Sequence, residues 1–315
     1  MTTIRLGQNN YGKSRVRLVR VAREPDRHDI ADLTVDVALE GDFAAAHLAG
    51  DNTGLLATDT MRNTVYALAK GTDVGDVERF GMRLVEHFVG AGPKVRRARI
   101  GLVSHPWERL AAAGGGPHEH AFRRTAGGER VATVAGDGSS WEIEAGIDGL
   151  VVLKTTGSGW EGYLHDEFTS LAETDDRIMA TEITARWTYG STDLDFTASW
   201  NAVRDVVLEA FGDHYSPSVQ FTLHRMGEAV LEARPEVQRI SFSLPNKHHL
   251  LYDLARFGIQ NDHEIFHATD EPYGLIEGTV ERAPVAERAS ADGNGIAAGV
   301  ATVTAEDPRA PFLLW

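Results

Sequence analysis

The chain contains no cysteine in its 315 residues. This absence excludes disulfides, zinc–thiolate sites, iron–sulfur clusters and a cysteine nucleophile. The chain also lacks a run of about 18 apolar residues, which a membrane-spanning helix requires. Its first residues lack the apolar stretch of a signal peptide, and its last residues, PFLLW, differ from a peroxisomal Ser-Lys-Leu address. We therefore expect a cytoplasmic protein that does not insert into membranes.

Positive charge is also scarce, since 31 Lys and Arg face 46 Asp and Glu, which gives a formal net charge of −15. Such an acidic chain is a poor partner for nucleic acid or for an anionic membrane surface. It also repels small anions at long range. An anionic substrate therefore needs Lys and Arg side chains placed at its own site.

Common nucleotide and metal motifs are missing as well. The sequence has no Walker phosphate loop, no GxGxxG after a predicted strand and no GxSxG elbow. His118 and His120 have the His-x-His spacing that is seen in zinc sites. They lie beside three glycines in what we interpret as a loop, without an obvious third ligand. We therefore predict no metal site.

Hydrophobic residues make up 42% of the chain, which suffices for a sizeable core. Alternation of period two predicts two strands within 14–40, and helical spacing predicts an amphipathic helix at 75–90. The other predicted elements are strands at 95–104, 119–136, 141–154, 178–191, 237–244 and 249–254, and two helices around 200–211 and 219–230. This arrangement predicts the α+β class, with helices on one side of an antiparallel sheet.

Both halves of the chain repeat the order strands, helix, strands, which gives weak support for a duplicated unit. After residue 282 the sequence becomes rich in Ala, Gly, Glu and Asp and loses useful periodicity. Such a composition is typical of a mobile segment, so we predict a mobile C-terminal tail at 283–315.

Candidate proton-transfer residues lie in three separate segments. Lys13 follows Tyr11 and Gly12 at a predicted strand start, where it is either a solvated lysine or, if desolvated, a base near neutral pH. Thr58, in ATDT, is either a structural hydroxyl or a relay that passes a proton to Lys13. His248 lies in SLPNKHH, where two adjacent histidines on a strand point to opposite faces. Each residue has a purely structural alternative when taken alone.

Candidate binding residues lie between Thr155 and Arg186. The planar guanidinium of Arg177 either forms an ion pair with a neighbour such as Asp175 or binds two acceptors of a flat anion. Trp160 either belongs to the core or stacks on a flat heterocycle. These residue types suit a planar, anionic, aromatic ligand.

Six short motifs, in this order along the chain, together resemble the urate oxidase (uricase) family. They are YGK at 11–13, ATDT with the NT that follows, LKTTGS before Trp160, ETDDRI with the ARW after it, SVQ at 218–220, and SLPNKHH at 243–249. The resemblance covers most of residues 5–280 and leaves the tail outside.

The resemblance implies the tunnelling fold, with tandem T-fold modules at 1–137 and 138–282. Each module is an antiparallel sheet with paired helices on one face. In this family, subunits assemble into a barrel, and two barrels stack into a homotetramer with active sites at subunit interfaces.

The resemblance also assigns catalytic roles by position. Lys13 and Thr58 match the family's catalytic dyad, and His248 matches its third member. The matching substrate-binding positions are Thr58, Asp59, Trp160, Leu171, Arg177, Val219, Gln220 and Asn246.

Within that binding set, Arg177 and Gln220 match the pair that grips the edges of urate. The backbone N–H groups of Asp59 and Val219 complete the in-plane hydrogen bonds, and Leu171 lines the pocket. Asn246 matches the residue that holds oxygen or water over the ring. Trp160 stands where the family usually has Phe, so stacking is kept while the shape of the pocket changes.

The activity implied by the resemblance is cofactor-free oxidation of urate by O2 to 5-hydroxyisourate and hydrogen peroxide, in purine degradation. Two alternatives stay open. One is a tunnelling-fold relative that acts on pterins or guanine nucleotides with histidine-bound zinc. The other is a purine-binding protein that kept the pocket without the catalysis. A metal assay tests the first, and urate binding without oxygen uptake would favour the second.

Overall fold

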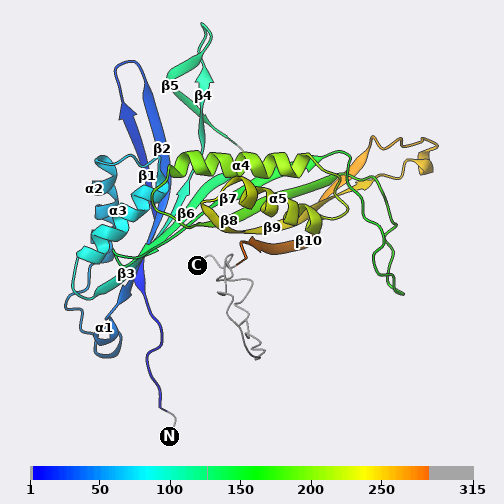
Figure 1. Cartoon of the computed structure of the whole chain (residues 1–315). Helices are drawn as coiled ribbons and strands as arrows, with labels where there is room; N and C mark the ends of the chain where they lie inside the picture. Colours follow the sequence, from blue (N-terminus) through cyan, green and yellow to red (C-terminus); the bar gives the residue numbers. More distant parts are fainter. Residues whose placement is uncertain (1–2, 126, 284–315) are drawn as a thin grey trace, which may run out of the picture.

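An eight-stranded antiparallel sheet combines strands from both halves of the chain in the order β1-β2-β3-β6-β7-β8-β9-β10 (Figure 1). This computed structural model describes residues 3–125 and 127–283, so the predicted mobile tail lies outside the described residues except for Ala283. The strands of the sheet are β1 (Tyr11–Arg23), β2 (His28–Gly41), β3 (Val95–Ser104), β6 (Glu129–Gly136), β7 (Trp141–Lys154), β8 (Met179–Tyr189), β9 (Val237–Leu251) and β10 (Phe266–Glu281). The edges of the sheet are therefore β1 and β10.

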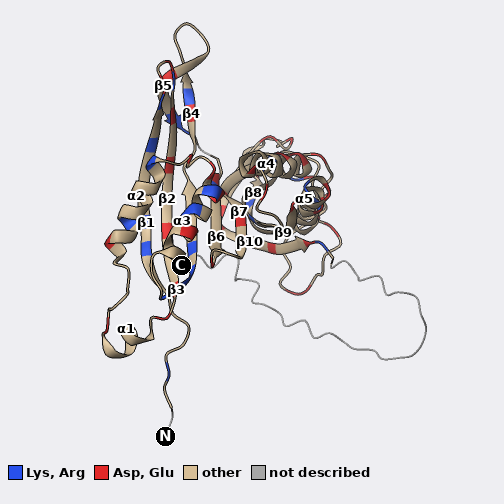
Figure 2. Cartoon of the chain, turned by 60° about the vertical axis from the view of Figure 1, so that its left-hand side comes forward, with Lys and Arg blue, Asp and Glu red and all other residues tan. Residues whose placement is uncertain are grey.

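Four of the helices cover one face of this sheet (Figures 1 and 2). The helices are α1 (Ala44–Ala49), α2 (Thr58–Lys70), α3 (Val77–Gly90), α4 (Phe196–Gly212) and α5 (Val219–Ala233), with a 3-10 turn at Ala255–Phe257. Asp76, Asp195 and Ser218 cap α3, α4 and α5 by accepting hydrogen bonds from backbone N–H groups of the first turn. Short polar side chains at these positions explain why the three helices begin where they do.

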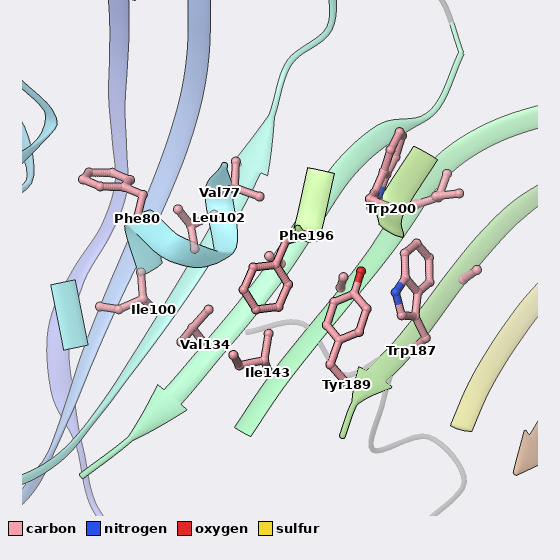
Figure 3. Packing of buried hydrophobic residues seen from close by; sticks show 14 of the residues in the cluster. Val77, Phe80, Ile100, Leu102, Val134, Ile143, Trp187, Tyr189, Phe196 and Trp200 are labelled. Atoms are coloured by element: carbon pink, nitrogen blue, oxygen red, sulfur yellow. The ribbon is translucent and has the colours of Figure 1, made fainter. Parts of the chain in front are cut away.

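The core lies between that face and the helices as one continuous cluster (Figure 3). Ile100 and Val134 point from β3 and β6 toward Phe80 of α3, and Trp187 of β8 is completely buried. The alternation along each strand and the helical spacing in α3 give each element one apolar side. The predicted α+β class, with helices on one side of an antiparallel sheet, is thereby confirmed.

A buried ion pair fixes the junction between the two halves of the sheet. Glu78 on α3 is completely buried and pairs with Arg130 on β6. The other guanidinium nitrogen of Arg130 donates to Thr197 Oγ1 on α4 at 3.1 Å. Arg79 adds a bond from its side chain to the Leu194 carbonyl at 2.9 Å. These contacts hold the two pairs of helices in one orientation.

Several elements differ from the sequence-based predictions. The single strand predicted at 119–136 is two strands of different sheets, β5 (Pro117–Arg124) and β6. Residues 237–254 form one continuous strand and a short loop, so SLPNKHH lies inside β9 and not between two strands. Strand β10 was not predicted, since its exposed positions hide the alternation. Residues 117–124 form β5, which pairs with β4 (Trp107–Ala111), so His118 and His120 lie on a strand and not in a loop.

No helix in the described part of the chain is long and apolar enough to cross a membrane.

Candidate functional site

Arg177 lies in the loop that joins β7 to β8, and the fold holds it from both sides. Its backbone N–H donates to the Ser158 carbonyl at 2.9 Å, and its Nε donates to the Gly159 carbonyl at 3.1 Å. The Ser158 hydroxyl donates back to the Arg177 carbonyl at 2.7 Å. Burial lowers the pKa of Arg177, which still leaves a guanidinium charged at neutral pH. Within residues 3–125 and 127–283 it pairs with no carboxylate, so the ion pair with Asp175 is not observed.

Trp160 begins the same loop and is half-buried, so it is not a core residue. Its backbone pairs with Thr174, with N···O distances of 2.7 and 3.1 Å. One face of its indole stacks on Tyr163, with ring centroids 5.4 Å apart and planes inclined by 16°. Tyr163 in turn stacks on His165 at 4.6 Å. The hydroxyl of Tyr163 donates to the carbonyl of Leu171, whose side chain is 58% exposed. The loop thus presents an aromatic platform.

The segment that leads into α5 lies against this loop. The N–H of Gly159 donates to the Ser216 carbonyl at 2.9 Å, and the N–H of Ser216 donates to the Gly157 carbonyl at 2.8 Å. Three residues further on, Val219 is buried and begins α5, and Gln220 is exposed. A helix N-terminus presents unpaired backbone N–H groups and a partial positive charge, which favour an anion. The structure therefore brings Trp160, Arg177, Val219 and Gln220 into one region.

Asn246 and His248 lie on β9, at the same end of the sheet. Asn246 is in register with Thr181 on β8, whose strand begins two residues after Arg177. On its other side Asn246 is in register with Gly274 on β10. His248 lies opposite Thr269 of β10 and is partly buried.

Lys13 and Thr58 form a second region at the opposite edge of the sheet. Lys13 is partly buried on β1, just before a bulge at which Arg15 adopts a φ of 58°. Thr58 begins α2 and is exposed. The N–H of Leu56 donates to the Tyr11 hydroxyl at 2.9 Å, which connects the start of α2 to β1. Leu56 lies two residues before Thr58, and Tyr11 lies two residues before Lys13. Both catalytic-dyad candidates therefore lie in the same part of the fold.

Asp59 follows Thr58 in the first turn of α2. Its carboxylate pairs with Arg62 at 2.7 Å and accepts a bond from Asn63 at 3.2 Å. The carboxylate is therefore engaged within the helix, and its backbone N–H is one of those that a helix leaves without an intrahelical acceptor. The other arginine in the predicted binding segment, Arg186, is buried and pairs with Asp148 at 2.6 Å, which gives it a structural role.

A single chain does not bring the two regions together. Six strand spacings separate β1 from β9, which amounts to about 29 Å measured along the sheet. We call the first region (Lys13, Thr58, Asp59) the relay half and the second (Trp160, Leu171, Arg177, Val219, Gln220, Asn246, His248) the clamp half.

Sequence reasoning missed several residues that support the clamp half. Tyr163 and His165 stack below Trp160, and Ser216 and Thr222 connect the loop to α5. The spacing Trp-x-x-Tyr-x-His was a visible signal for the aromatic stack. Buried serines and threonines give no such signal, because the same residue types dominate exposed loops.

The part of the chain that the structure describes holds no group of three or more His, Asp or Glu side chains placed to bind a metal ion. The rings of His118 and His120 lie 4.7 Å apart on the β4–β5 hairpin, nearly perpendicular to each other. This hairpin projects away from both halves of the site (Figure 1).

Comparison with known proteins gives one consistent result. The family model described as Uricase matches residues 9–135 and 143–277. Uricase from Arthrobacter globiformis is 47% identical over 281 residues, which cover 89% of this chain and 91% of that protein. Uricase from Dictyostelium discoideum is 37% identical over 276 residues, or 87% and 96% of the two chains. The crystal structure of the Arthrobacter globiformis uricase superposes with a TM-score of 0.85 at 46% identity, covering 93% of this chain and 98% of that one.

Proposed function

The chain belongs to the uricase family of oxidoreductases, and on that premise we propose that it oxidises urate with O2, without a cofactor, to 5-hydroxyisourate and hydrogen peroxide. In this reaction urate, O2 and water are consumed. Urate loses two electrons, water supplies the hydroxyl group, and O2 takes up two electrons and two protons to become hydrogen peroxide.

The observation that carries this proposal is the environment of Arg177. Its guanidinium is partly buried, its Nε is fixed on the Gly159 carbonyl, and its terminal nitrogens have no protein acceptor among the described residues. A planar cation held in this way suits two acceptors on one edge of a flat anion. The α5 N-terminus adds a second positive contribution in a chain whose net charge is −15.

In this proposal the residues of the clamp half bind urate. Arg177 and the Gln220 amide bind the edges of urate, and the N–H of Val219 donates in the plane of the ring. The free face of Trp160 stacks on the purine, with Leu171 at the rim. A purine that lacks the matching acceptors leaves Arg177 unpaired, which provides specificity.

In this proposal the residues of the relay half carry out the first proton transfers. Lys13 accepts a proton from urate through the Thr58 hydroxyl, and the N–H of Asp59 completes the in-plane bonds. Deprotonation raises the electron density of urate, which lets it pass electrons to oxygen directly. His248 completes the relay, and Asn246 holds oxygen or water over the ring.

The separation of the two halves supports a site shared between chains, in a homotetramer with its active sites at subunit interfaces. The relay half lies at the β1 edge and the clamp half near the β10 edge, so the clamp half of one copy can meet the relay half of another. Apolar side chains are exposed around the β9–β10 end, and they are Leu250, Leu251, Tyr252, Phe257, Tyr273 and Leu275.

The test is oxygen uptake on addition of urate to purified, metal-stripped protein. We expect one O2 consumed and one hydrogen peroxide formed for each urate whose ultraviolet band disappears. Activity that vanishes with a chelator and returns with metal would contradict the cofactor-free mechanism. Tight urate binding without oxygen uptake would identify a purine-binding protein instead.

A further inference from the structure

A short chain of buried polar groups lies beneath the clamp half. Ser216 is completely buried, and Thr222, in the first turns of α5, is 1% exposed. His214 lies between α4 and α5 and is half-buried. None of the three side chains has a role in the proposed mechanism. Buried hydroxyls of this kind are costly unless each finds a partner.

The hydrogen bonds join these three side chains in sequence. Nδ1 of His214 lies 2.7 Å from the Ala210 carbonyl, and its Nε2 lies 3.0 Å from Thr222 Oγ1. Thr222 Oγ1 lies 2.6 Å from Ser216 Oγ. A carbonyl can only accept, so Nδ1 carries a hydrogen.

The charge state of His214 fixes the direction of the remaining bonds. Burial lowers the pKa of His214, and the charges of Lys154 and Arg225 lower it further. The hydrogen bond to the Ala210 carbonyl and the charge of Asp213 act in the opposite direction without reversing the shift. The ring is therefore neutral at pH 7, and Nε2 accepts from the Thr222 hydroxyl. Thr222 has a single hydrogen, so its oxygen accepts from Ser216. The chain runs one way, from Ser216 through Thr222 to His214.

Ser216 connects this chain to the loop that holds Arg177 and to the start of α5. Its backbone binds both Gly157 and Gly159, which flank the serine that holds the Arg177 backbone. Its hydroxyl oxygen also contacts the carbonyl oxygen of Ser218, the residue that caps α5, at 3.0 Å. This is a packing contact, because the one hydroxyl hydrogen of Ser216 goes to Thr222. Movement of Ser216 would therefore shift the guanidinium and the α5 N-terminus relative to each other.

We propose that the chain Ser216–Thr222–His214 sets the spacing between Arg177 and the first turn of α5, and so determines urate affinity. Thr222 and His214 are positioning residues, since they act on the purine only through the clamp half. This inference rests on the proposed function, because it takes the ligand of the clamp half to be urate.

The test is urate binding under anaerobic conditions, which measures the clamp half without turnover. Thr222→Val keeps the shape of the side chain and removes the hydroxyl. We expect urate to bind roughly 10- to 100-fold more weakly, which corresponds to about 1.4–2.8 kcal/mol of binding free energy. The KM should rise by a similar factor while kcat at saturating urate changes by less than about threefold. Thr222→Ser restores the hydroxyl and should restore affinity.

A matched control is Ser241→Ala, because Ser241 is buried, like Ser216, and pairs with a threonine hydroxyl. Its Oγ lies 2.7 Å from Thr279 Oγ1, at the far end of β9 from the clamp half. This variant should lose stability comparable to that of Ser216→Ala and keep wild-type urate affinity. If Thr222→Val fails to fold, Ser216→Ala breaks the same chain from its other end and carries the same expectation.

Wild-type affinity in a folded Thr222→Val or Ser216→Ala variant would overturn this inference. Equal loss in Thr222→Val and Thr222→Ser would overturn it as well, because packing rather than the hydroxyl would then be responsible. A wild-type protein that neither binds nor oxidises urate would instead contradict the proposed function.

Discussion

The clamp half and the relay half are built differently. The clamp half rests on buried Ser158, Ser216 and Thr222, each with a hydrogen-bond partner, and α5 begins with a serine cap. In the relay half, Thr58 is exposed, and Ala57 precedes α2 without any side-chain cap. One region is preorganised by its own chain, and the other has its functional side chains at a surface.

This difference shows what each half requires. Binding a planar anion depends on fixed donors, whose position must hold before the ligand arrives. A proton relay needs only to be close to the ligand once it is bound. We infer that a second chain completes the surroundings of Lys13 and Thr58, because Thr58 is exposed and Lys13 only partly buried in a single chain.

The largest effect is expected at Lys13. Lys13→Met removes the base from the relay half and leaves the clamp half intact. We expect kcat to fall by about 10²- to 10⁴-fold with little change in anaerobic urate affinity. Lys70→Met, at the exposed C-terminal end of the α2 helix that Thr58 begins, is the control and should keep wild-type turnover. Intact turnover in Lys13→Met would remove Lys13 from the relay.

Arg177→Lys is expected to act on binding first. Lysine keeps the charge but loses the planar fork and the bond from Nε to Gly159. We expect the KM for urate to rise on the order of 100-fold, since a charged hydrogen bond contributes about 1.5–3 kcal/mol. Arg225→Lys, on the exposed side of α5 beside Glu228, serves as the matched control. A KM within twofold of wild type would show that Arg177 does not bind urate.

Substitutions of Trp160 separate the contribution of stacking from the structural role of the indole in its loop. Trp160→Ala removes the stacking face and should raise the KM about tenfold, in line with an aromatic contact of about 0.5–1.5 kcal/mol plus the buried area. Trp160→Phe keeps a ring above Tyr163 and should change the KM by less than about threefold. Equal losses in the two variants would mean that the loop, rather than stacking, depends on the indole.

The smallest expected effect is on how the free energy of unfolding depends on pH. The pKa of His214 is lowered by burial in the folded protein. Between that lowered pKa and the usual value of about 6.5, the unfolded chain binds more protons at His214 than the folded chain does. Stability should therefore fall as the pH drops below about 6.5. In His214→Gln, urea unfolding at fixed protein concentration should show a pH slope smaller by at most about 1.4 kcal/mol per pH unit. An unchanged slope would contradict a lowered pKa at His214.

Much of the fold could be predicted from the sequence because its periodicity is regular. Leu33, Val35, Val37 and Leu39 alternate on β2 and are all buried, and Phe80, Leu84 and Phe88 share the buried side of α3. Strand β10 escaped prediction because most of its residues are exposed, so no buried face produced a pattern.

The site could be predicted only in part. Arg177 and Trp160 carry distinctive chemistry that the sequence displays, and the structure places their loop beside the segment that leads into α5. The distance between the relay half and the clamp half has no signature in the sequence, since it follows from the order of eight strands. Ser216 and Thr222 likewise have no local pattern, because their importance arises from burial.

The most direct measurement mixes two defective chains. Lys13→Met and Arg177→Gln each damage one half, and co-expression with different tags allows mixed oligomers to be purified. If each site takes its relay half from one chain and its clamp half from another, random assembly leaves about one quarter of the sites intact. We therefore expect mixed oligomers to recover about one quarter of the wild-type kcat/KM, far above either variant alone. Recovery of no activity in confirmed mixed oligomers would place the whole site within a single chain and contradict the shared site.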